Sequence, residues 1–362
     1  MRLMSPPKNI ILTSTLMASF FLSACGDDND PTAHNSSGQN SSEKNSPPNQ
    51  EISSRETESS SNNATSSAPA VPPNNTTADG PFQANTDPSC SDGRYTEELP
   101  DVSADIDHLI NDFYALDNPT TEQMAQVQLD VFDIAYPHGA YILRNSPGFD
   151  GAGRCDLTFS DVEKFGTTSP WNFAIHECGH ALDFERDTYF LSSNYETPIP
   201  TNDYFGRGEI TKDRFHNDIP DAFANSTYFE DSSAKQGIHT TYSEWSQYTH
   251  SVAVNYLLWR FPKLEYDFDT RAMLNFMWAA QRYWLWAKEQ RPQDYTAMLN
   301  DEKLREATLL LWGQSWLYYD ALGKNTTWQE TDKHLQYINA MKRPELLAVL
   351  NEVRIKHGCI GL

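Results

Sequence analysis

The sequence predicts an α+β fold that is mostly helical, with a small sheet in its first half and a helical C-terminal region. Apolar residues recur at helical spacing almost throughout residues 241–356, which is typical of helices that bury one face. Two short apolar runs, 141–143 and 157–159, predict strands, and a glycine-rich loop separates them. Large apolar side chains are scarce between residues 26 and 88, so we expect the packed domain to begin near residue 90.

The individual helices follow from the same spacing. Ile106, Ile110 and Phe113 predict a helix over 104–116, and Met124 and Val131 predict a second one that starts near residue 121. Further along, the expected helices cover 241–260, 270–290, 302–322, 329–341 and 344–356. Tryptophan and tyrosine are frequent in these segments. Because large aromatic side chains are mostly buried, we expect them to form a core.

The N-terminus has the pattern of an export signal. Arg2 and Lys8 precede an apolar stretch, residues 10–22, that is too short and too often interrupted by polar residues to span a membrane. The stretch ends in Leu-Ser-Ala-Cys at 22–25, which resembles the lipobox of bacterial lipoproteins. This resemblance implies cleavage after residue 24, a lipid anchor on Cys25 and, with Gly26 following, sorting to the outer membrane of the cell envelope. An ordinary secretory signal peptide is the alternative.

Composition divides the chain into four segments. A signal peptide covers 1–24, and a disordered tether rich in Ser, Asn and Pro covers 25–89. Residues 90–262 form the region that carries the motif described below, and residues 263–362 form a helical region packed on it. The formal net charge of −23 argues against nucleic acid as a partner and is compatible with a protein or peptide.

Four cysteines follow Cys25, and an exported protein can join them in two disulfides. Cys90 and Cys359 bracket the domain, so a bridge between them is reasonable, while Cys178 is either a packed thiol or bridged. The connectivity of Cys90, Cys155, Cys178 and Cys359 cannot be deduced from the sequence alone.

The most informative segment is His176-Glu177-Cys178-Gly179-His180, an H-E-x-x-H motif. On a helix, residues four apart lie on one face, so the two histidines can present nitrogens to one metal ion while Glu177 lies beside a bound water. Because helix interiors disfavour glycine, Gly179 is expected to allow the close approach of another group. The alternative is a pair of exposed polar histidines with no metal.

The flanking residues predict the helix that carries this motif. Ser169 and Pro170 provide an N-cap and a proline at the first helical position. Apolar residues then form a stripe on a different face from the histidines: Trp171, Ala174, Ile175, Cys178 and Leu182. Asp183 either accepts a hydrogen bond from a ligand imidazole or is an ordinary polar residue.

A catalytic zinc ion needs a third protein ligand, and two residues are candidates. Asp221 opens a segment with Ala224 at +3 and Asn225 at +4, and small residues there let a second helix close on the first. Glu244 is the alternative, although Thr241 three residues earlier would make it part of a helix capping box. Asp221 is preferred by a narrow margin.

These segments resemble zinc metallopeptidases of the zincin class. The metzincin continuation after His180 is absent, so the resemblance is to gluzincins, whose third ligand comes from a later helix. The motif helix together with Asp221-Ala222-Phe223-Ala224-Asn225 distantly resembles the anthrax lethal-factor-like catalytic domain, which has glutamate where this chain has Asp221. The resemblance implies a zincin-like catalytic lobe with a small sheet, over 90–262.

The function expected from these features is zinc-dependent hydrolysis of peptide bonds by an endopeptidase. Zn²⁺ is the expected cofactor, with His176, His180 and Asp221 or Glu244 as ligands and Glu177 as general base. Tyr242 is one candidate for stabilising the oxyanion. The alternatives are a non-catalytic surface lipoprotein that binds peptide or glycan with a vestigial zinc site, and a zinc amidase acting on cell-wall material.

Overall fold

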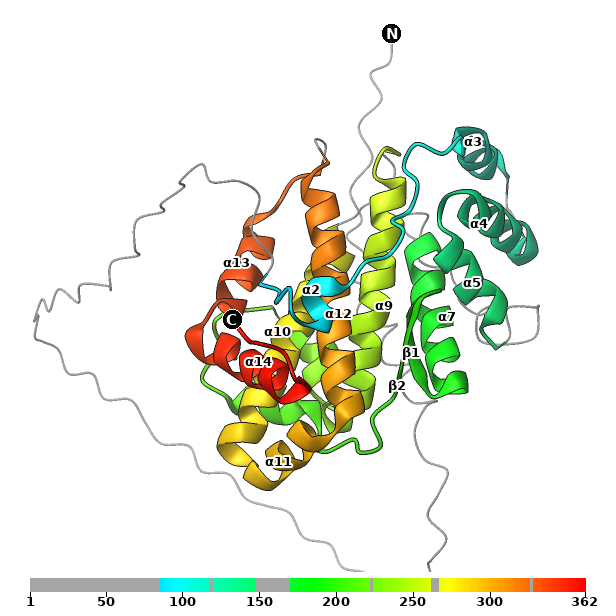
Figure 1. Ribbon diagram of the computed structural model, residues 1–362. Helices are drawn as coiled ribbons and strands as arrows, with labels where there is room; N and C mark the ends of the chain where they lie inside the picture. The colour runs from blue at the N-terminus through cyan, green and yellow to red at the C-terminus, as the bar shows by residue number, and fades with distance from the viewer. Residues whose placement is uncertain (1–84, 118–119, 148–169, 222–223, 262–266, 326–327) are drawn as a thin grey trace, which may run out of the picture. The chain divides into compact units, whose positions relative to one another are not determined.

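The computed structural model describes residues 85–362, except 118–119, 148–169, 222–223, 262–266 and 326–327 (Figure 1). The described chain is mostly helical and has one two-stranded antiparallel sheet. The mostly helical α+β class is therefore confirmed. The helices and strands, in chain order, are α2 Ser91–Arg94, α3 Asp107–Ala115, α4 Thr121–Ala135, α5 Pro137–Asn145, α7 Pro170–Arg186, β1 Thr188–Ser192, β2 Tyr195–Pro198, α9 Ile238–Leu258, α10 Asp267–Gln290, α11 Pro292–Asn300, α12 Glu302–Gly323, α13 Asp332–Met341 and α14 Pro344–His357.

Helix α9 lies at the centre of the fold and contacts α7, α10, α12 and β1 (Figure 1). Of its 21 residues, 18 are buried, so it has no solvent face. Several of these buried residues are polar, among them Ser243, Glu244, Gln247 and His250. Buried polar groups need partners inside the protein. For these four residues the partners come from α7, from β1 and from Tyr136; those at the candidate metal centre are described below.

The sheet is a hairpin that follows the motif helix. Asp187, directly after α7, has a φ of 55°, the left-handed conformation in which helices often end. In the hairpin Tyr189 pairs with Thr197 and Phe190 with Glu196. The main chain of Phe190 ties the hairpin to both neighbouring helices, because its N–H donates to Asp183 at 2.9 Å and its carbonyl lies 2.8 Å from His250 Nε2.

The expectation of a strand at 141–143 was wrong. These residues belong to α5, which begins with Pro137 at its first position and buries Ile142 and Leu143. A short apolar run fits a buried strand and a buried helical turn equally well, so periodicity alone cannot separate them. The second expected strand, 157–159, lies outside the described residues.

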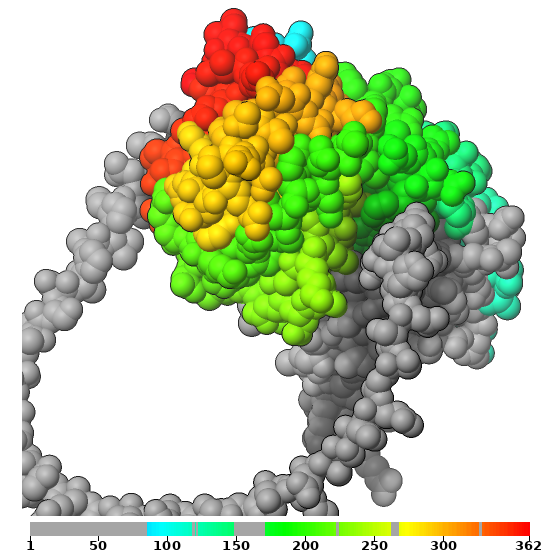
Figure 2. All heavy atoms as spheres, turned by 90° about the horizontal axis from the view of Figure 1, so that it is seen from below, coloured from blue at the N-terminus to red at the C-terminus, as the bar shows by residue number. Residues whose placement is uncertain are grey.

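The two ends of the described chain are joined. A disulfide connects Cys90 and Cys359, as the sequence suggested. Beside it, Arg354 of α14 forms a buried ion pair with Asp92 of α2 at 2.7 Å. Figure 2 shows the cyan segment that starts the described chain against the red C-terminal segment. The disulfide and the ion pair together hold α2 against α12 and α14.

The expected aromatic core is confirmed. Trp284 of α10 and Trp312 and Tyr318 of α12 are almost completely buried within one cluster of apolar side chains. Among the described helices, none is both long enough and apolar enough to cross a bilayer.

Candidate metal centre

Helix α7 presents the two motif histidines on one face. The Nε2 atoms of His176 and His180 lie 3.1 Å apart, as expected for residues one turn apart. The opposite, apolar face is buried, with Trp171, Ile175 and Leu182 at 2% exposure or less. Cys178 on that face is disulfide-bonded. The expected N-cap, Ser169, lies outside the described residues.

Glu244 of α9 supplies a third donor atom. Its Oε2 lies 3.4 Å from His176 Nε2 and 3.7 Å from His180 Nε2, and its side chain is 5% exposed. These residues form a group that could hold a metal ion. In a tetrahedral zinc site with bonds of about 2.0–2.1 Å, neighbouring ligand atoms lie about 3.3–3.4 Å apart. The three observed separations scatter closely around that value.

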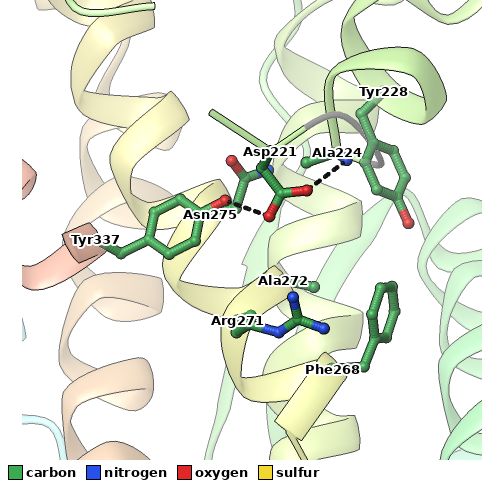
Figure 3. A pocket seen from close by; sticks show the side chains of 8 residues that line it. All are labelled: Asp221, Ala224, Tyr228, Phe268, Arg271, Ala272, Asn275 and Tyr337. Carbon is green, nitrogen blue, oxygen red and sulfur yellow. Dashed lines mark hydrogen bonds between the residues drawn. The ribbon is translucent and has the colours of Figure 1, made fainter. Parts of the chain in front are cut away.

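Asp221 does not join this group, and the preference for it over Glu244 was wrong. Its carboxylate accepts hydrogen bonds from the Ala224 N–H and the Tyr337 hydroxyl, each at 3.1 Å. Figure 3 shows these two bonds. Asp221 therefore caps a helical turn and binds Tyr337 of α13, away from the histidines.

The capping box that argued against Glu244 is also absent. Helix α9 begins at Ile238, so Thr241 lies inside the helix and its hydroxyl donates to the Gly237 carbonyl at 2.7 Å. Glu244 lies well inside the helix, with its side chain directed at the histidines rather than at the helix end.

Gly179 allows α9 to approach α7. A Cβ atom on Gly179 would lie 1.6 Å from Oε1 of Gln247, and Gln247 lies one turn from Glu244 on α9. The small residue needed for close contact is therefore on the motif helix. This agrees with the expectation that Gly179 allows the close approach of another group, whereas the small residue Ala224 at +3 had favoured Asp221.

Asp183 orients His180 through Ser243. The Nδ1 atom of His180 lies 2.7 Å from Ser243 Oγ, which in turn donates to Asp183 at 3.2 Å. Because the Ser243 hydroxyl donates to Asp183, it accepts the Nδ1–H of His180. In the neutral ring the lone pair is therefore on Nε2, the atom next to Glu244 and His176. Gln247 also donates to Asp183, at 2.7 Å. Burial raises the pKa of the Asp183 carboxyl to about 7.

The three donor atoms attract positive charge. Burial opposes ionisation of Glu244, but hydrogen bonds from His176 and His180 outweigh it and lower the pKa of Glu244 well below its usual range. Burial likewise disfavours the imidazolium form of His180, yet bonding to Glu244 prevails and raises the pKa of His180. A proton shared here occupies the place that a cation would take.

Glu177 and two tyrosines flank the cluster. Glu177 is partly exposed, while the Tyr248 ring packs edge-on against His176 with a centroid separation of 4.4 Å. The Tyr248 hydroxyl is hydrogen-bonded to that of Tyr228, which lies in a π-helical turn, Asn225–Phe229. Tyr242 instead bonds Thr308 at 2.8 Å, within the aromatic core.

Sequence reasoning missed Ser243, Gln247, Tyr228 and Tyr248. Gln247 and Tyr248 follow Glu244 by three and four residues, so they share its helix face and could have been found once Glu244 was chosen. Ser243 and Tyr228 carry no such signal.

No protein-family model, curated protein or solved structure matches the chain.

Proposed function

We propose that the protein is a zinc-dependent endopeptidase of the gluzincin type, with His176, His180 and Glu244 as zinc ligands. The observation that supports this most is the convergence of three donor atoms at tetrahedral spacing. Two imidazoles and one carboxylate are a common protein ligand set for catalytic zinc, which keeps a fourth position open. Glutamate as the third ligand also agrees with gluzincins. The resemblance to lethal-factor-like domains is weaker, because it also depended on the segment that begins at Asp221, and Asp221 is not part of this group.

The chemistry divides between the ion and the chain. Zinc held here would lower the pKa of a water molecule and polarise a peptide carbonyl. Glu177 would accept the proton of the attacking water and return it to the leaving amine. The hydroxyl of Tyr248 or Tyr228 would donate a hydrogen bond to the developing oxyanion. Ser243 keeps His180 in the tautomer that binds metal.

The test compares the wild-type chain with Glu177→Gln. We expect both to bind one zinc ion, and the variant to cleave casein about 100- to 10,000-fold more slowly, since it loses only proton transfer. Glu185→Gln, at an exposed position of the same helix, is the matched control and is expected to retain full activity.

A wild-type protein that binds one zinc ion but cleaves neither casein nor a broad peptide library would overturn the proposal. It would favour a non-catalytic binding module. Release of amino groups from purified cell-wall material, with casein intact, would favour the amidase alternative instead.

We also propose that Cys25 carries a lipid that anchors the domain to the cell envelope, favouring the outer membrane. The support is the Leu-Ser-Ala-Cys sequence at 22–25 and the polar tether that follows it. Labelling with a radioactive fatty acid should mark the wild type but not Cys25→Ser, and unlabelled wild type would refute the anchor.

A further inference from the structure

Arg207 is a buried arginine that no described carboxylate pairs with. It is 0% exposed. The other two described arginines with at most 2% exposure, Arg282 and Arg354, each form an ion pair with an aspartate at 2.7 Å. In the part of the chain that the structure describes, Nη1 of Arg207 has no hydrogen-bond partner. Burial of an unpaired charge is destabilising, which makes Arg207 a candidate for a functional role.

Two neutral acceptors fix the orientation of this guanidinium. Arg207 begins a 3₁₀ turn, Arg207–Lys212, that packs against a second turn, Ser233–Lys235. Its Nε donates to the Ser233 carbonyl at 3.2 Å, and its Nη2 donates to Oε1 of Gln236 at 2.5 Å. These bonds hold the side chain in place. Because neither acceptor is charged, they leave the positive charge uncompensated.

Arg207 lies behind the two tyrosines of the candidate metal centre. Its Cζ is 5.5 Å from the centroid of the Tyr228 ring, within the range of a cation–π interaction. The Tyr228 hydroxyl is bonded to that of Tyr248, whose ring packs against His176. Burial lowers the pKa of Arg207, and the carboxylate of Glu244 is the charge that opposes this most. The guanidinium is therefore coupled electrostatically to the third candidate ligand, although no ion pair joins them.

Three carboxylates surround the donor atoms of this centre. Burial disfavours the imidazolium form of His180, but Glu244, Glu177 and Asp183 outweigh it and raise the pKa of His180. The same carboxylates would repel the negative charge that develops on a substrate carbonyl oxygen during hydrolysis. A fixed cation that is shielded from water stabilises such charge more strongly than a solvated one. Arg207 is a cation of this kind.

We propose that Arg207 is a positioning residue for hydrolysis at this centre: acting through Tyr228 and through space, its unpaired charge favours negative charge on the bound substrate. This inference rests on the proposed function. A carboxylate beside Arg207 would cancel its field at the centre, which accounts for the absence of one among the described residues. The same field repels a cation held by Glu244 and the histidines, so the charge weakens metal binding while it stabilises a bound anion.

The test neutralises the charge without removing the arginine. Gln236→Glu keeps the acceptor in place and gives Nη2 a carboxylate partner. The protein is loaded with Co²⁺, which reports ligand binding through its visible absorption, and is titrated with azide, an anion, and with imidazole, which is neutral at about pH 8. We expect Gln236→Glu to weaken azide binding about threefold or more, to leave imidazole binding within about twofold and to tighten Co²⁺ binding. Gln293→Glu, at an exposed position of α11, is the matched control and should change none of these.

Arg207→Met should give the same pattern with a larger loss of azide binding, about tenfold. A purely structural role of Arg207 predicts instead that azide, imidazole and Co²⁺ all bind more weakly. That result, or unchanged azide binding in both variants, would overturn the proposal. If Arg207→Met fails to fold by circular dichroism, Gln236→Glu, which keeps the size of the side chain, decides alone.

Cleavage of casein separates this proposal from the catalytic one. We expect Gln236→Glu to lower kcat about threefold or more and to leave KM unchanged, because it acts on charge that develops during the reaction. Cleavage by the wild type, with azide binding equal in the wild type and the variants, refutes the role of Arg207 and keeps the enzyme. A charge-selective loss of azide binding in a protein that cleaves nothing refutes the enzyme and keeps the electrostatic role of Arg207. A wild type that binds no metal ion refutes both.

Discussion

Replacing Gly179 with alanine tests the contact that brings Glu244 to the histidines. The new Cβ would lie 1.6 Å from Oε1 and 2.4 Å from Cδ of Gln247, which is fully buried and bonded to Asp183. Overpacking costs about 1–3 kcal/mol, and losing a hydrogen bond to a charged group costs about 1.5–3 kcal/mol. Alanine recovers about 1 kcal/mol of helix propensity. The net expected loss of unfolding free energy is therefore about 3 kcal/mol.

The assay is urea unfolding of the metal-free protein, followed by zinc titration. Gly323→Ala is the control, because a Cβ there meets no atom within 4 Å, and it should be neutral or slightly stabilising. Truncating Gln247 to alanine should remove the clash and make Gly179→Ala nearly neutral in that background. If Gly179→Ala alone equals or exceeds the wild type in stability, as helix propensity by itself would give, the proposed packing of α7 on α9 is refuted.

Further predictions concern the ligands and the buried carboxyl groups. By calorimetry, Glu244→Gln should weaken zinc binding at least about 100-fold, whereas Asp221→Asn should change it less than about twofold; the reverse order would refute the ligand assignment. Ser243→Ala should weaken zinc binding about tenfold, because the His180 Nδ1–H loses its acceptor. The pKa of His180 is raised above 6.5, so protons compete with the metal ion for this residue. As the pH is lowered, zinc affinity should therefore begin to decrease while the pH is still above 6.5. Constant affinity down to about pH 5 would contradict this. Burial raises the pKa of Glu97 to about 7 from 4.5, so the native state retains a proton that the unfolded chain releases. The free energy of unfolding of the wild type, measured in urea, should therefore decrease relative to that of Glu97→Gln as the pH rises from about 5 to about 8. If the two proteins show the same dependence on pH, the raised pKa of Glu97 is contradicted.

The long helices of the C-terminal half could be predicted from the sequence because their apolar spacing extends over several turns. Even α9, which is buried on every side, was predicted as a helix over 241–260. The hairpin at 188–198 and helix α11 were not anticipated, since each is short. The polar pair Ser193-Asn194 between two β-favouring runs was the available signal for the hairpin.

The candidate metal centre was predicted in part. His176 and His180 belong to one helix, so local geometry alone places their nitrogens together. The third donor depends on how two helices pack. The sequence predicts a close approach at Gly179, but it does not show which later residue that approach brings to the histidines. Gly179 on the motif helix accommodates Gln247, which lets Glu244 reach the histidines although large residues follow it. Asp221, with small residues after it, instead lines a separate cavity.

Anomalous diffraction at the zinc absorption edge, from crystals of the full-length protein with one equivalent of zinc, tests the central claim most directly. We predict a single peak about 2.0–2.2 Å from Nε2 of His176, Nε2 of His180 and a carboxylate oxygen of Glu244, with a fourth position left to water. A peak beside Asp221, a fourth protein ligand that closes the site, or no peak at these residues would contradict the account.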